Sequence, residues 1–247
     1  MSGEPVAPLG PGWRRERASA APQPLTPERI VAAAIDLVDR EGLDALSMRR
    51  LGTELGAGAT TLYWHVKNKD ELLDLMLDRV FVEIDPPDAG LPWRDQLRAM
   101  ANNLRQVLLR HRNLIMVVAS RPTTGPNAVA AIDQLFGVVR RSGLPDDRVV
   151  AAAISVLNYT SGFAVLEAAS LAQFGPGADE DAIRQSVRES TEQVMGYILA
   201  LPPDRYPNVQ AVGRYLVEGD DDSRFAYGLE VMLDGLDADV ARSVASA

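Results

Sequence analysis

The side chains best suited to chemistry lie in one short segment, residues 60–66, where hydroxyl, aromatic and imidazole groups follow one another. Leu62 and Val66 are four residues apart, so in a helix they share one face and can enter a hydrophobic core. The remaining side chains must then face outward: Thr60, Thr61, Tyr63, Trp64 and His65. Donors, acceptors and apolar edges on one exposed helix are what direct reading of base pairs in a DNA major groove requires.

Catalysis and metal binding find little support in the rest of the chain. It contains no cysteine and two histidines, His65 and His111. Metal sites and nucleophile–base pairs are built mainly from these residue types. The glycines at 56–58 lack the third glycine and the preceding strand of a dinucleotide loop. We therefore expect no enzyme activity, no metal and no cofactor; an enzyme and a purely structural helical adaptor are the rival classes.

Three short helices are expected to position the exposed segment. The first follows a capping Thr26 and a proline, and it ends at Gly42. Ser47 caps the second helix, and the turn at 56–58 leads into a third at 59–65. A short helix that follows another across a glycine turn predicts a helix-turn-helix.

Positive charge gathers beside this segment. The formal net charge is -9 over 247 residues, which argues against a protein that coats nucleic acid. Between Ser47 and Lys69, four basic side chains stand against one acid (4 − 1 = +3): Arg49, Arg50, Lys67 and Lys69 against Glu54. This local excess fits contact with phosphate. The alternative is that Tyr63 and Trp64 are core aromatics and the charges form a solvated face.

The stretch 61–69, with Arg49, Leu51, Leu55 and Gly56 before it, resembles the DNA-binding domain of the tetracycline repressor (TetR) family. The matching segment is Thr61-Leu62-Tyr63-Trp64-His65-Val66-Lys67-Asn68-Lys69. The resemblance implies that Arg49 donates to a guanine edge and that Trp64 and Lys69 hold the DNA backbone. It assigns contacts with bases or flanking phosphates to the other exposed side chains: Thr60, Thr61, Tyr63 and His65. We add Ser47, at the start of the second helix, to this DNA-binding set.

The operator sequence cannot be carried over from the family. Ala59 and Thr60 stand where the tetracycline repressor itself has Gln and Pro. The resemblance therefore transfers the mode of binding and leaves the sequence that is read undetermined.

A connecting helix is expected after the DNA-binding region. Asn68 caps it, Glu71 stands three residues on, and Pro86 ends it. In the family such a helix sets the distance between two reading heads, so its tilt is a candidate switch. We divide the chain into four parts: a disordered tail at 1–24, a helix-turn-helix domain at 25–70, the connecting helix at 71–86, and a helical ligand-binding and dimerisation domain at 87–247.

The larger domain is expected to be helical throughout, which makes the fold class all-α. Apolar spacing predicts helices at 92–111, 114–119, 129–139, 146–173, 181–199 and 224–242, and mostly loop with one short helix at 202–219. The segments 108–112, 120–123, 162–167 and 227–230 resemble the C-terminal domain of the tetracycline repressor. The helix from Asp146 is rich in small residues, and pairing it with the last helix across a two-fold axis would form the four-helix bundle of a homodimer. The alternative is that both helices fill an intramolecular core.

The ligand of the larger domain is expected to be a small, mostly apolar molecule. The tetracycline repressor holds magnesium through a histidine just before the Arg-Pro that matches Arg121-Pro122, whereas this chain has Met116-Val117-Val118-Ala119-Ser120 there. Aliphatic side chains do not coordinate magnesium, which argues against a tetracycline–magnesium complex. The expected pocket is apolar, with polar anchors: Met100, Leu104, Val117, Phe136, Leu157 and Phe163, with Asn158, Thr160 or Glu167. The alternative for each residue is ordinary core.

Composition sets the remaining expectations. The first 24 residues hold five prolines and a basic cluster, which is either a solvated tail or an arm that touches DNA: Arg14, Arg15 and Arg17. No basic-then-apolar leader is seen, so we expect a cytoplasmic protein without a membrane segment. Together these features predict a ligand-responsive transcriptional repressor that binds a palindromic double-stranded operator as a homodimer.

Overall fold

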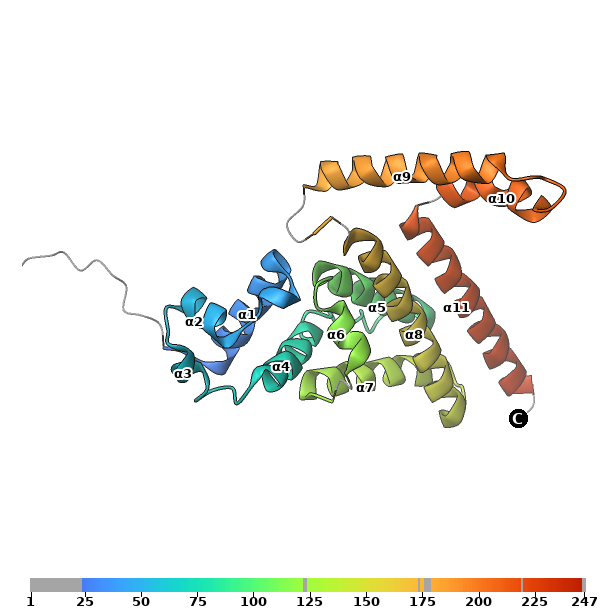
Figure 1. Cartoon of the computed structure of the whole chain (residues 1–247). Helices are drawn as coiled ribbons and strands as arrows, with labels where there is room; N and C mark the ends of the chain where they lie inside the picture. The colour runs from blue at the N-terminus through green and yellow to red at the C-terminus, as the bar shows by residue number, and fades with distance from the viewer. Residues whose placement is uncertain (1–23, 122–123, 173, 176–178, 219, 246–247) are drawn as a thin grey trace, which may run out of the picture.

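The computed structural model describes residues 24–121, 124–172, 174–175, 179–218 and 220–245. Within these residues the chain forms eleven α-helices, one 3-10 turn and no strand (Figure 1). The expectation of an all-α fold is confirmed. The tail at 1–23, with its three arginines, lies outside the described residues.

The N-terminal head comprises three helices and the 3-10 turn: α1 (Pro27–Glu41), η1 (Leu43–Ala45), α2 (Met48–Leu55) and α3 (Ala59–Leu62). Gly52 allows α2 to approach the following turn, because a Cβ at this position would lie 2.7 Å from the carbonyl oxygen of Ala57. The centre of the head is fully buried aliphatic core: Ile30, Leu37, Leu51, Leu62 and Val66.

The helix starts of the head are capped as the sequence predicts. Thr26 Oγ1 accepts a hydrogen bond from the Arg29 amide at 3.3 Å. Ser47 Oγ accepts one from the Arg50 amide at 3.1 Å. Each bond satisfies an amide that has no partner within its helix.

Helix α4 (Lys69–Phe81) connects the head to the larger domain. Asn68 Oδ1 caps it by accepting from the Glu71 amide at 2.8 Å, as expected. One side of α4 packs against α1 and another against α7. Its buried side chains contact both domains: Leu72, Leu73, Met76, Leu77 and Val80.

The larger domain is built around four central helices: α5 (Trp93–Arg110), α6 (Ile115–Ser120), α7 (Pro126–Arg140) and α8 (Asp146–Ala172). Helix α8 packs against α5, α7 and the last helix, α11 (Asp221–Ala245). A second core lies among them, with fully buried aliphatic side chains: Leu97, Val139, Ala153 and Leu233. The positions of these helices follow the predicted apolar periodicity.

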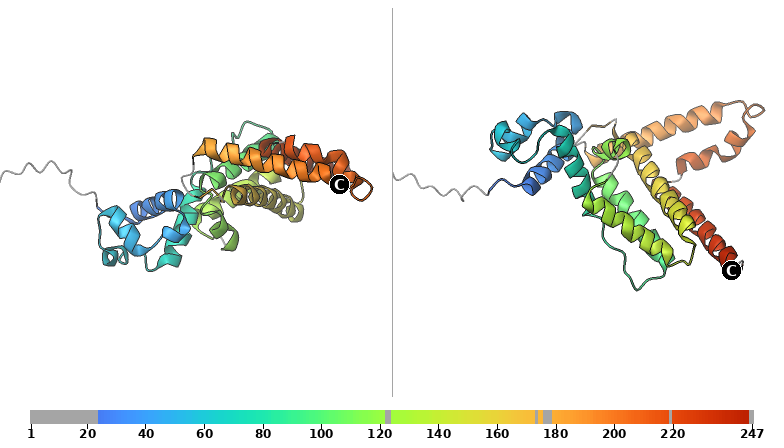
Figure 2. Two further views of the ribbon diagram at one scale, coloured as in Figure 1. Left: turned by 45° about the horizontal axis from the view of Figure 1, so that its top comes forward. Right: turned by 90° about the horizontal axis from the view of Figure 1, so that it is seen from below.

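The segment 202–219 was expected to be mostly loop with one short helix, and the helix is longer than expected. Helix α10 (Pro207–Glu218) occupies most of this segment and lies beside α9 (Glu180–Ala200). The amide of Gln210 donates to the carbonyl oxygens of Ile198 and Leu201 at 2.7 and 2.8 Å, which attaches α10 to the end of α9. Figure 2 shows the two helices as a hairpin that extends away from α5–α8.

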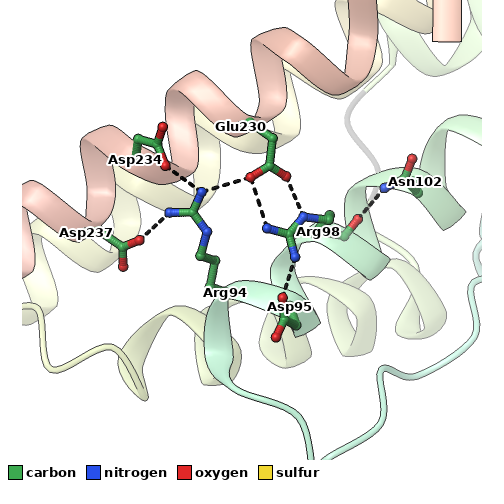
Figure 3. A network of polar contacts seen from close by, with 7 residues as sticks. All are labelled: Arg94, Asp95, Arg98, Asn102, Glu230, Asp234 and Asp237. Carbon is green, nitrogen blue, oxygen red and sulfur yellow. Dashed lines mark hydrogen bonds and ion pairs between the residues drawn. The ribbon is translucent and has the colours of Figure 1, made fainter. Parts of the chain in front are cut away.

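A network of ion pairs attaches α11 to the start of α5 (Figure 3). Arg94 binds Glu230 at 2.8 Å and Asp234 at 2.6 Å, and it also binds Asp237. Arg98 pairs with the same Glu230 from the next turn of α5. These hydrogen bonds hold the pKa of Glu230 down to about 2, so its carboxylate stays charged well into the acid range.

Within the described residues, α8 is the one helix whose length and composition would allow it to cross a membrane. From the sequence we expected no segment of this kind. Since α8 is covered on one side by α5, α7 and α11, we attribute its apolar character to packing between helices.

Candidate functional site

The exposed segment at 60–66, called the reading segment from here on, starts on α3. This helix ends at Leu62, three residues before the predicted end at His65. Beyond Leu62 the backbone continues in tight turns: the Trp64 amide bonds to the carbonyl oxygen of Thr61 at 3.3 Å, and the His65 amide to that of Leu62 at 2.9 Å. Such i to i+3 bonds shorten a last helical turn. The tightening returns Val66 to the core before α4 begins.

The side chains of this segment divide between the core and solvent as their spacing predicts. Leu62 and Val66 are fully buried, whereas Tyr63 is 51% exposed and Trp64 is 85% exposed. The hydroxyl and imidazole side chains of the segment are exposed as well: Thr60, Thr61 and His65. The alternative that both aromatics are core residues is wrong, because the head has filled its interior with aliphatic side chains.

The basic residues of α2 differ in what they bind. Arg50 is held by two carboxylates, Glu41 at 2.5 Å and Glu54 at 2.9 Å. Arg49 is exposed, and no carboxylate pairs with it among the described residues. The local positive charge is therefore partly neutralised, and Arg49 is the α2 guanidinium that remains available to a ligand.

Lys69 stands at the first turn of α4 and already uses one donor. Its ammonium group donates to the carbonyl oxygen of Leu46 at 2.8 Å. An ammonium carries three donors, so a phosphate can still be bound. Lys69 therefore holds the start of α4 to the loop before α2.

A cavity of about 310 Å³ lies in the larger domain. Its walls are apolar except for Asn158, Thr160 and Ser161, all on α8. The apolar members come from five helices and the turn after α4: Phe81, Ile84, Leu97, Met100, Ala101, Leu104, Leu108, Ile115, Ala131, Ile132, Leu135, Val156, Leu157 and Val165. This volume falls toward the lower end of the range of roughly 300–1,000 Å³ that small-molecule sites occupy.

Half of the predicted ligand-binding set lines this cavity: Met100, Leu104, Leu157 and Asn158. Val117 does not, because α6 directs it into the core of the head. Phe136 packs against the second core instead. Neither side chain lines the cavity, although α6 and α7 both contribute to its wall, because packing between helices decides which side chains of each helix face the cavity.

Phe163 and Glu167 also lie outside the cavity lining, in a polar-aromatic cluster between α5, α8 and α11. Phe163 meets Phe225 edge to face, with ring centroids 5.4 Å apart. Glu167 binds the buried guanidinium of Arg105 at 2.8 Å. Burial raises the pKa of Glu167 more than its bond to Arg105 lowers it. Both side chains thus join helices to one another.

Comparison with known proteins decides the family. The family described as "Bacterial regulatory proteins, tetR family" matches residues 30–76, and the one described as "Tetracyclin repressor-like, C-terminal domain" matches residues 86–240. The chain belongs to the TetR family of transcriptional regulators. The first match covers the head and the second the domain that contains the cavity.

Individual relatives of this TetR-family chain agree with the assignment. An HTH-type transcriptional regulator of Saccharopolyspora erythraea is 42% identical over 157 residues, which are 63% of this chain and 66% of that protein. The HTH-type transcriptional repressor DrrR1 of Streptomyces coeruleorubidus is 37% identical over 235 residues, 92% of this chain and 83% of that one. The crystal structure of ActR from Streptomyces coelicolor in complex with actinorhodin is similar with a TM-score of 0.75 and 34% identity, over 88% of this chain and 99% of that one.

Helix α4 of this TetR-family chain is bound to the larger domain through Asp78. Oδ1 of Asp78 accepts from the amides of Asn127 and Ala128 at 2.9 and 3.0 Å, at the start of α7. Gly125 is required beside it, because a Cβ there would lie 2.2 Å from the same oxygen. Sequence reasoning missed this contact, since Asp78 reads as one more acid on a polar helix face.

A second contact joins α4 to the end of α6. Arg121 binds Asp70 at 2.5 Å and Asp74 at 3.0 Å, both on α4. Phe81 and Ile84 then place the other end of α4 and the turn after it in the cavity wall. The sequence predicts the connecting helix, but only the fold shows that its end reaches the cavity.

Proposed function

We propose that this chain is a homodimeric repressor that binds a two-fold symmetric operator and releases it when a small, mostly apolar molecule enters the cavity. The observation that carries the proposal is that one helix touches both sites. Helix α4 begins directly after the reading segment, and at its other end Phe81 contributes to the cavity wall. A ligand that contacts Phe81 and Ile84 can therefore change the tilt of α4.

The DNA contacts are assigned to the exposed side chains of the head. Arg49 is exposed and is assigned to a guanine edge, since Arg to guanine O6 and N7 is the commonest specific contact. Trp64 and Lys69 are assigned to the backbone of the DNA. The side chains that meet bases or nearby phosphates are Ser47, Thr60, Thr61, Tyr63 and His65.

The dimer is assigned to the outward faces of α8 and α11. Val150, Ile154 and Leu166 are exposed on α8, and Tyr227 and Val231 on α11. Exposed apolar side chains that gather on one surface mark sites of protein–protein interaction. Pairing both helices with their copies across a two-fold axis would cover them. One helix-turn-helix also offers few contacts for specific binding, so two heads are needed.

The coupling is assigned to the contacts of α4. Asp78 attaches α4 to the start of α7, and Arg121 attaches it to the end of α6. Both α7 and α4 contribute to the cavity wall. Since half-sites lie about one helical turn of DNA apart, roughly 34 Å, a small rotation of α4 in each subunit would move the heads out of register.

The relatives support the direction of the response. DrrR1 is described as a transcriptional repressor, and ActR has been solved in complex with actinorhodin. By analogy with them, we propose that this chain represses transcription in the cytoplasm. A small molecule that binds in the larger domain would relieve the repression.

The experiment that tests this function uses the purified full chain. Sequencing of DNA selected from a random library should return an inverted repeat with half-sites about one helical turn apart. Gel-shift titration on that DNA should then show release by a subset of a panel of small apolar compounds. Failure to enrich any duplex, or enrichment of a single asymmetric half-site, would contradict the proposal.

A further inference from the structure

The cavity contains one polar group that the fold does not satisfy. Thr160 is fully buried, and its Oγ1 has no hydrogen-bond partner among the described residues. Thr160 lines the cavity on the buried side of α8. An unbonded buried hydroxyl destabilises a folded chain and is rare in native proteins, which indicates that a partner arrives with the ligand.

A bound water is a poor substitute for that partner. A buried water is held by about three hydrogen bonds to polar groups. The cavity offers three polar side chains, all from α8, and Asn158 among them is also exposed to solvent. The opposite walls are aliphatic and aromatic, so a water beside Thr160 would lack partners there.

The cavity also lacks charge. None of the described residues that line it has an ionisable side chain. Arg105, the buried guanidinium on α5, already binds Glu167 at 2.8 Å and Asp222 at 2.6 Å. A charged ligand would lose its hydration in this cavity without gaining a counter-charge.

We propose that the cavity selects an uncharged, largely apolar molecule that carries one hydrogen-bonding group, and that Thr160 is the specificity-determining residue that bonds this group. The inference rests on the proposed function, because it takes the cavity to be the effector site. A hydroxyl can donate to a carbonyl oxygen or accept from another hydroxyl, so the bonded group is a ketone, quinone, phenol or alcohol.

The melting temperature of the ligand-free protein distinguishes a ligand-binding role of Thr160 from a structural role. The Thr160→Val variant removes an unbonded hydroxyl, so the melting temperature of the ligand-free protein should rise, by about 2–4 °C for each kcal/mol regained. A hydroxyl that belonged to the fold would give a fall. Thr160→Ser keeps the hydroxyl and serves as the conservative variant.

Three probes that share one ring system test the ligand class: naphthalene, 2-naphthol and 2-naphthoate. Titration calorimetry on the full chain should show that 2-naphthol binds about 3- to 10-fold more tightly than naphthalene, as one net hydrogen bond allows, and that 2-naphthoate binds most weakly. Thr160→Val should remove the preference for 2-naphthol and leave naphthalene unchanged, and Thr160→Ser should keep the preference. Thr53→Val, which removes an exposed hydroxyl in the head, should change none of these affinities.

The inference is overturned if 2-naphthoate binds best, if none of the probes binds, or if Thr160→Val retains the preference for 2-naphthol. The proposed function fails separately. If 2-naphthol binds through Thr160 but does not change the affinity for the selected DNA, the ligand class stands and the regulatory role of the cavity is wrong.

Discussion

His111 Nδ1 lies 2.7 Å from Oδ2 of Asp39, so the end of α5 is bonded to α1 of the DNA-binding head. The other ring nitrogen lies 3.2 Å from Glu83, which also binds Arg110 at 2.6 Å. A neutral imidazole has one N–H, so only the protonated ring donates to both carboxylates. The bond to Asp39 raises the pKa of His111, burial lowers it, and the bond to Glu83 raises it further; the net change is upward.

The His111 cluster predicts a pH-dependent stability. Because the pKa of His111 is raised by folding, its stabilisation is complete below the unfolded pKa, about 6.5, and is lost as the pH rises through the folded pKa. Urea denaturation from about pH 6 to about pH 9 should show a falling free energy of unfolding. His111→Gln should flatten that fall, and the exposed His65→Gln should not. If the free energy of unfolding of His111→Gln still falls with pH as in the wild type, the His111 cluster is not the cause of the pH dependence.

Arg49 and Lys69 are expected to contribute differently to operator binding. Arg49→Ala should cost about 1–3 kcal/mol and relax the preference at one base pair. Lys69→Ala should weaken all sequences alike and reduce the salt dependence, because it acts on phosphate. Binding titrations on the selected operator and on scrambled DNA at several salt concentrations measure both effects. Equal loss of sequence preference in the two variants would refute these roles.

Tyr63 is expected to serve DNA binding without supporting the fold. Since half of its surface is exposed, Tyr63→Ala should abolish operator binding in a gel shift while the melting temperature stays nearly the same. Leu62→Ala provides the opposite control, because it empties a fully buried site and should cost about 2–5 kcal/mol of stability. A large thermal loss in Tyr63→Ala would assign the residue to the core.

Gly162 reports on the dimer interface. It lies exposed on α8, and a Cβ built there meets no atom within 4 Å in the single chain. Gly162→Trp should therefore leave the subunit folded and shift the mass in solution toward the monomer, as measured by light scattering. Gly137→Leu, at an equally open position on α7, should remain dimeric. An unchanged mass in Gly162→Trp would mean that the subunits meet elsewhere.

Asp78 is expected to carry the response from the cavity to α4. Asp78→Ala removes three hydrogen bonds at the start of α7, from the backbone amides of Asn127 and Ala128 and from the side chain of Asn127. The loss should cost about 0.5–2 kcal/mol, as the loss of a helix cap does. DNA binding should persist, but more ligand should be needed for release. The control variant Asp133→Ala removes an exposed acid from α7, the helix that Asp78 binds, and should leave the release curve unchanged. Normal release by the Asp78 variant would place the coupling in other contacts.

The sequence predicts what is local and fails where distant segments meet. Thr26, Ser47 and Asn68 each cap a helix as expected, because a cap and its amide are three residues apart. The length of helix α10 was underestimated, since the bonds of Gln210 to the end of α9 supply part of its stability. Val117 was expected in the cavity wall and lies in the core of the head, because the packing of α6 decides its direction.

The central claim is that the cavity and the DNA-binding head are linked through α4, and reciprocal binding tests it most directly. If a ligand lowers operator affinity by some factor, the operator must lower ligand affinity by the same factor. Calorimetric titration of one releasing compound, with and without the selected operator, should give equal factors of at least about fivefold. Ligand affinity that is identical with and without operator would contradict the account.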